Sequence, residues 1–142
     1  MAQFVIAVLD GDWGCLDLLD DVLTDAGYQT VLWEAGTDAD ALIRRSRPDL
    51  VILDSWLQER GDGLRLLERL GHDPLTASIP VLICSSEGES LPLCLPPNRR
   101  YAILAKPFDL AGLLAAVAAL LAHRGEVSVN SSTFPARAAS RI

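Results

Sequence analysis

The sequence predicts an α/β fold, a doubly wound sheet of five parallel strands with helices on both faces. Short, continuous apolar runs alternate along the chain with segments in which leucine recurs at helical spacing. The apolar runs lack polar alternation, which is typical of parallel strands buried on both faces. The chain has 142 residues and half of them are hydrophobic, enough for one domain with a sizeable core.

Five apolar runs predict the strands. They cover residues 4–9, 28–33, 50–53, 81–84 and 101–104. Polar side chains follow four of these runs: Asp10, Asp54, Ser85 and Lys106. Because the carboxyl ends of parallel strands meet at one edge of a sheet, we expect these four side chains to converge there.

Leucine spacing and end signals predict four regular helices. They carry residues 16–23, 42–43, 64–70 and 110–124. Thr37 is the candidate N-cap of the second helix, and Gly71 is the candidate C-cap of the third. Asp109 can cap the last. A helix expected between 86 and 100 should be irregular or missing, because three prolines lie there and each costs about 3 kcal/mol inside a helix.

Composition excludes several classes of function. The net charge is −7 and no uninterrupted basic run is longer than a pair such as Arg99–Arg100, so direct binding to nucleic acid is not expected. The longest apolar stretch, 113–122, is too short to cross a membrane. Cys15, Cys84 and Cys94 are irregularly spaced, with no zinc pattern, which favours a reducing, cytoplasmic compartment.

The chain divides into one domain and a tail. Residues 1–125 hold every predicted strand and helix. Residues 126–142 mix serine, alanine, proline and arginine without periodicity, which predicts a flexible tail. We therefore expect no room for a further output domain in this chain.

Five short motifs resemble those of the receiver domain of two-component response regulators. They are Val-Leu-Asp-Gly-Asp at 8–12, Pro-Asp-Leu-Val-Ile-Leu-Asp at 48–54, Asp-Gly at 62–63, Pro-Val-Leu-Ile-Cys-Ser at 80–85 and Lys-Pro-Phe at 106–108. The resemblance covers about residues 4–124. It implies a five-stranded, doubly wound parallel domain, the fold that the apolar runs predict independently.

The resemblance implies a role for each polar strand end. Asp54 would accept a phosphoryl group from a histidine kinase or a phosphotransfer protein, as a carboxylate can attack phosphorus. Lys106 would neutralise phosphoryl oxygens, aimed by a cis bond to Pro107. Ser85 would offer its hydroxyl to the phosphoryl group. Each also has a plain structural reading, as a strand-end or loop residue.

A magnesium ion is the cofactor that the resemblance implies. Its ligands would be the carboxylates of Asp10 and Asp54 and the backbone carbonyl of Trp56. The family carries a second acidic residue where this chain has Gly11, which predicts weakened Mg²⁺ binding that an aspartate there would tighten. Asp12 is either a compensating metal ligand or the N-cap of the first helix, and the sequence leaves both open.

The segments that transmit the signal in the family also differ in this chain. Ile103 stands where the family has an aromatic switch residue, and the helix that usually shares the output face falls in the proline-rich segment. We therefore expect phosphorylation to reorder residues 86–100, which would contact a downstream protein or a second copy of the chain in a homodimer.

Two other functions remain open from the sequence. A pseudo-receiver would keep the fold as an interaction module without phosphorylation. A haloacid-dehalogenase-type phosphatase would use Asp10 and Asp12 as its nucleophile motif, but Trp13 and Gly14 come next, where that family needs a threonine or valine. A receiver is not a dedicated enzyme, although it can hydrolyse its own acyl phosphate.

Overall fold

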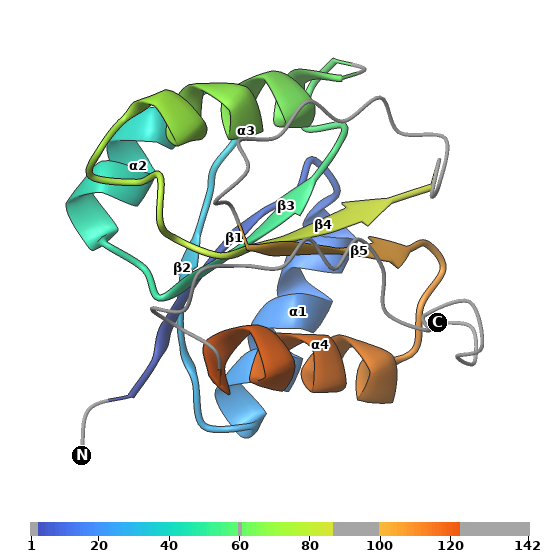
Figure 1. Cartoon of the computed structure of the whole chain (residues 1–142). Coiled ribbons are helices and arrows are strands. Elements are labelled where there is room, and N and C mark those ends of the chain that lie inside the picture. Colours follow the sequence, from blue (N-terminus) through green and yellow to red (C-terminus); the bar gives the residue numbers. More distant parts are fainter. Residues whose placement is uncertain (1–2, 60, 87–99, 123–142) are drawn as a thin grey trace.

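The computed structural model describes residues 3–59, 61–86 and 100–122 and has the expected doubly wound fold (Figure 1). Five parallel strands form one sheet in the order β2-β1-β3-β4-β5. The strands are β1 (Val5–Leu9), β2 (Gln29–Leu32), β3 (Leu50–Asp54), β4 (Val81–Ser85) and β5 (Tyr101–Ala105). Each lies within a residue or two of its predicted run.

Four helices are described, two on each face of the sheet (Figure 1). They are α1 (Trp13–Asp25), α2 (Ala39–Ser46), α3 (Asp62–His72) and α4 (Leu110–Ala122). One hydrophobic core joins α1 and α4 to the sheet, and a second core joins α2 and α3 to its opposite face. The central strand β3 is buried along its whole length, which explains why its sequence is apolar at successive positions.

Two predicted helix caps are wrong. The N-cap of α2 is Asp38, whose carboxylate accepts a hydrogen bond from the backbone N–H of Ala41 at 3.2 Å. The Thr37 hydroxyl instead donates to the carbonyl of Glu34. Gly71 does not cap α3, because the helix continues through it and is capped at Asp73.

Three other expectations fall outside the described residues. They are the irregular fourth helix with the proposed contact segment, the end of the last helix beyond Ala122, and the tail at 126–142.

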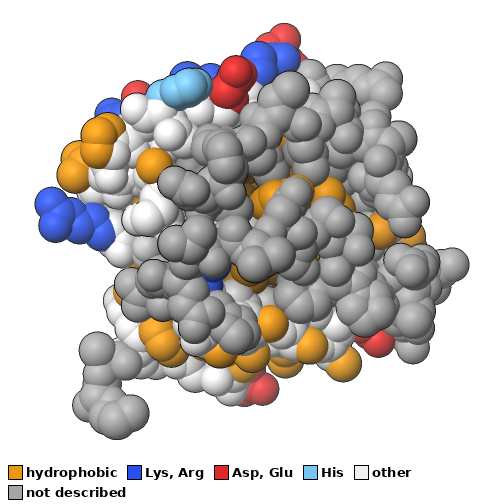
Figure 2. Space-filling model, viewed as in Figure 1, with side chains coloured by type: hydrophobic (Ala, Val, Ile, Leu, Met, Phe, Trp, Pro, Cys, Tyr) orange, Lys and Arg blue, Asp and Glu red, His pale blue; other side chains and the backbone are white. Residues whose placement is uncertain are grey.

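The described surface differs between the two helical layers. Figure 2 shows charged side chains of both signs gathered over α2 and α3, where Arg69 pairs with Asp40 at 2.9 Å. The helix α4 carries no charged residue. Within the part of the chain that the structure describes, no helix is long and apolar enough to cross a membrane.

Candidate functional site

Three of the predicted site residues meet at the carboxyl edge of the sheet. The ammonium group of Lys106 lies 3.1 Å from Oδ2 of Asp10 and also forms an ion pair with Oδ2 of Asp54. Asp10 follows β1, Asp54 ends β3 and Lys106 follows β5, so 96 residues separate the outer members of the cluster. The parallel order of the strands brings them together.

The cluster is largely shielded from water. The side chains of Asp10 and Asp54 are 4% and 10% exposed, and that of Lys106 is 25% exposed. Burial raises the pKa of Asp54 and the Asp10 carboxylate adds to this, against the opposing effects of Lys106 and the Trp56 N–H. Burial alone would lower the pKa of Lys106, but the two carboxylates outweigh it and hold the pKa above its ordinary value.

The backbone aims Lys106 into the cluster. The Lys106–Pro107 peptide bond is cis, as the resemblance implied. The N–H of Lys106 donates to the carbonyl of Ser85 at 2.9 Å, which ties the lysine to the end of β4. This bond continues the β4–β5 ladder, in which Ser85 is paired with Ala105.

Ser85 is fully buried and lies beside a residue that the sequence did not single out. The hydroxyl of Ser55 donates to the hydroxyl of Ser85 at 3.1 Å. Ser55 directly follows the candidate acceptor, and its backbone N–H donates to the carbonyl of Cys84 at 3.2 Å. A serine after a strand gives no sign of a partner 30 residues away, so no local pattern could have found this pair.

Asp12 caps α1. Its carboxylate accepts hydrogen bonds from the backbone N–H groups of Gly14 at 2.8 Å and Cys15 at 3.3 Å. Its own N–H donates to Asp10 at 2.9 Å, which fixes the Asp10 carboxylate at the strand end. Among the described residues, no three His, Cys, Asp or Glu side chains form a metal-binding group. A metal role for Asp12 stays a prediction.

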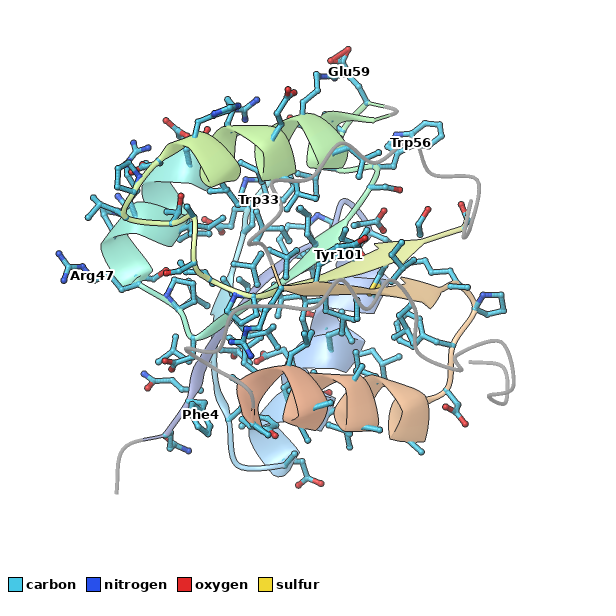
Figure 3. All side chains as sticks on the ribbon, viewed as in Figure 1. Phe4, Trp33, Arg47, Trp56, Glu59 and Tyr101 are labelled. Atoms are coloured by element: carbon cyan, nitrogen blue, oxygen red, sulfur yellow. The ribbon has the colours of Figure 1, made fainter. Side chains whose placement is uncertain are left out.

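The segment after Asp54 is held from both sides. The N–H of Trp56 donates to Oδ1 of Asp54 at 2.8 Å, and the Trp56 ring is 54% exposed beside the start of α3 (Figure 3). The Asp62 carboxylate accepts from the N–H groups of Leu57, Gln58 and Glu59 at 2.7 to 3.0 Å. Asp62 thus sets the path of the chain over residues 57–59, which we call the acceptor loop.

The thiol of Cys15 also faces this cluster. Burial first, and then a hydrogen bond with Asp10, raises the pKa of Cys15 to about 12. The thiol is therefore protonated at neutral pH and is a poor nucleophile. It lines a cavity of about 410 Å³ that also touches Lys106, Pro107 and Phe108.

The acceptor loop should detach from Asp62 in acid. Burial alone would raise the pKa of Asp62, but the three N–H donors outweigh it and hold the pKa below its ordinary value of 3.8. A carboxyl of this kind stabilises the folded chain above its unfolded-state pKa, and the contribution is lost as pH falls through the folded-state pKa. The amide proton shifts of Leu57, Gln58 and Glu59 should therefore change together with a midpoint below 3.8.

The control for this titration is Asp62→Asn, which has no titratable carboxyl and should show no such joint change. A midpoint above 3.8 in the wild-type chain would contradict the assignment, because it would mean that the loop amides favour the protonated acid.

Comparison with known proteins identifies the family. Residues 6–118 match the response regulator receiver domain, and the chain belongs to this family. It is 35% identical over 117 residues to the DNA-binding dual master transcriptional regulator RpaA of Synechocystis, covering 82% of this chain and 48% of that protein. It is 33% identical over 107 residues to sporulation initiation phosphotransferase F of Bacillus subtilis, covering 74% of this chain and 83% of that protein.

Solved receiver structures share the fold. A response regulator from Chloroflexus aurantiacus is 26% identical and superposes with a TM-score of 0.70, covering 85% of this chain and 99% of that one. The receiver domain of sensor histidine kinase PA1611 from Pseudomonas aeruginosa, with a magnesium ion in its active-site cleft, has a TM-score of 0.71 at 20% identity. It covers 85% of this chain and 99% of that one.

Family membership and the fold argue against the two alternative functions, the pseudo-receiver and the phosphatase. The chain is a receiver domain homologous to phosphoacceptor domains, and a phosphorylation-independent module is not favoured. Lys106 is followed by α4, whereas a haloacid-dehalogenase-type phosphatase needs an acidic residue on a strand there. The chain spans about half the length of RpaA and 55% of a second relative, the phosphate regulon regulator PhoB of Pseudomonas aeruginosa.

Proposed function

We propose that Asp54 is the phosphoacceptor of this receiver domain. The observation that supports the proposal most strongly is the Lys106 ammonium group in contact with the Asp54 carboxylate at the edge of the sheet. The Asp54 carboxylate is mostly shielded, so a donor must place its phosphoryl group directly against this edge. The acceptor is thus positioned with its counter-charge before the donor arrives.

The chemistry requires one bond to form and one to break. An oxygen of Asp54 attacks phosphorus while the bond from phosphorus to the donor imidazole nitrogen breaks and leaves its electron pair on the imidazole. The product is an acyl phosphate on Asp54. Lys106 offsets negative charge on the phosphoryl oxygens, and Ser85 can donate its hydroxyl hydrogen to one of them.

The donor set fits a magnesium ion. Two carboxylates and one ammonium group leave the cluster with a net charge of about −1 when both acids are ionised, which a divalent cation can offset. Asp10, Asp54 and the backbone carbonyl of Trp56 would hold it. When bound, Mg²⁺ supplies positive charge against the phosphoryl oxygens.

The proposed partners follow from the same site. A histidine kinase or a phosphotransfer protein would supply the phosphoryl group, and a downstream protein or a second copy of the chain would receive the signal. Slow hydrolysis of the acyl phosphate by the domain itself and a cytoplasmic location complete the proposal. Direct contact with DNA is not part of it, because the charge of −7 opposes approach to phosphates.

Intact-mass measurement after treatment with acetyl phosphate and Mg²⁺ tests the acceptor. Wild-type protein should gain the mass of one phosphoryl group, and Asp54→Asn should gain none, because an amide cannot form the acyl phosphate. Asp38→Asn is a matched control, since Asp38 caps α2 away from the site and this variant should label like wild type. Equal labelling of Asp54→Asn would refute the assignment.

A further inference from the structure

A main-chain oxygen lies where the side chain of residue 11 would begin. A Cβ atom placed on Gly11 would lie 1.9 Å from the carbonyl oxygen of Leu57 and 2.9 Å from its carbonyl carbon. Both are backbone atoms, which cannot rotate away as the end of a flexible side chain can. Gly11 is therefore required by the path of the acceptor loop, and an oxygen of that loop fills the start of the missing side chain.

Asp62 aims this oxygen. The peptide unit that carries the Leu57 carbonyl also carries the N–H of Gln58, which donates to Oδ2 of Asp62 at 2.9 Å. In a trans peptide the C=O points opposite to the N–H. With the N–H held by Asp62, the Leu57 carbonyl faces away from α3 and toward Gly11. Two neighbouring bonds to Asp62, from Leu57 and Glu59, keep the loop in this orientation.

The Leu57 carbonyl oxygen contacts a residue that adjoins the cluster of two carboxylates and one lysine. Gly11 directly follows Asp10, whose carboxylate meets Lys106 3.1 Å away, and Lys106 in turn contacts Asp54. The resemblance implies that the acidic side chain which the family has at the position of Gly11 reaches the cation. A main-chain carbonyl is also an oxygen ligand of the kind that Mg²⁺ accepts, although it carries no full charge.

We infer that the carbonyl oxygen of Leu57 takes the place of that acidic side chain as a cation ligand. The inference rests on the proposed binding of Mg²⁺ at the Asp54 site. It reverses one expectation from the sequence: an aspartate at position 11 does not restore the family's site, because its Cβ displaces the oxygen that has replaced it. The acceptor loop and Gly11 would then act together at the cation site.

Carbon-13 NMR of the wild-type chain tests the inference without any substitution. Protein labelled at leucine carbonyl carbons and aspartate carboxyl carbons is titrated with MgCl₂. We expect the Leu57 carbonyl signal to shift and to saturate at the same Mg²⁺ concentration as the signals of Asp10 and Asp54. A static Leu57 signal beside moving carboxyl signals would overturn the inference alone. Static carboxyl signals would refute the proposed Mg²⁺ site and the inference with it.

Substitutions at Gly11 give an independent test. We expect Gly11→Ala to weaken Mg²⁺ binding about tenfold, as loss of a supporting group at a metal site does, and Gly11→Asp not to tighten it. The control is Asp38→Asn, which alters the cap of α2 away from the site and should keep the affinity within about twofold.

Tryptophan fluorescence reports the binding, and circular dichroism confirms that each variant is folded. Tighter binding by Gly11→Asp would overturn the inference, as would unchanged binding by Gly11→Ala. If either variant fails to fold, the carbon-13 titration of wild type decides the question.

Discussion

Replacing Gly63 with alanine should lower the free energy of unfolding by about 2–3 kcal/mol, because the added methyl group has no space. A Cβ on this residue would lie 2.0 Å from the carbonyl oxygen of Asp54 and 2.9 Å from the Cα of Ser55. Both atoms belong to the backbone at the end of β3, where the proposed acceptor Asp54 lies. The first turn of α3 must therefore move away from the end of β3, against the Gly63 N–H bond to Ser55.

Chemical denaturation of Gly63→Ala and wild type measures this loss, and labelling with acetyl phosphate should slow in the same variant because Asp54 is displaced. Gly14→Ala is the control, since it adds the same methyl group to a helix next to the site but meets only a side-chain oxygen at 3.3 Å. Equal free energies of unfolding for Gly63→Ala and Gly14→Ala would show that a methyl group at position 63 does not clash with the end of β3.

Lys106→Met should slow phosphorylation by acetyl phosphate about 100-fold, the loss typical of removing one preorganised group that stabilises transition-state charge. Methionine keeps most of the length and apolar contact of the side chain but removes the charge that meets Asp10 and Asp54. The rate should be compared with that of Arg69→Met, which removes a cation from the pair with Asp40 that joins α3 to α2.

The same variant should also change the dependence of stability on pH. Burial already raises the pKa of Asp54, and loss of Lys106 removes an opposing effect, so the pKa rises further. A carboxyl with a raised folded-state pKa stabilises the fold below its unfolded-state pKa, and that contribution is lost as pH rises through the folded-state value. The free energy of unfolding should fall more steeply as pH rises above 3.8 in Lys106→Met than in wild type. Parallel curves would mean that the two carboxylates do not depend on the lysine.

The sheet and most of the cluster could be predicted because their signals are local. An apolar run indicates that a strand is buried, and the parallel order then implies that Asp10, Asp54 and Lys106 meet. Caps were less certain for a physical reason: Thr37 and Asp38 are neighbours with similar capping chemistry, and only the backbone decides that Asp38 caps α2.

The rest of the site is made of contacts that leave no local pattern. The bond between Ser55 and Ser85 joins two strand ends 30 residues apart, and either serine alone suggests only a turn. The approach of the Leu57 carbonyl to Gly11 is a contact between backbones, so side-chain chemistry cannot indicate it. A glycine in place of an expected acid was visible in the sequence, but its cause lay 46 positions further along the chain, in the acceptor loop.

The most direct test of Asp54 as the acceptor locates the phosphoryl group itself. After acetyl phosphate treatment, borohydride reduces an aspartyl phosphate to homoserine, and mass spectrometry of the digested chain identifies the residue that was changed. We expect homoserine at position 54 and an unmodified aspartate at positions 10 and 12. Homoserine at position 10 or 12, with Asp54 intact, would contradict the assignment.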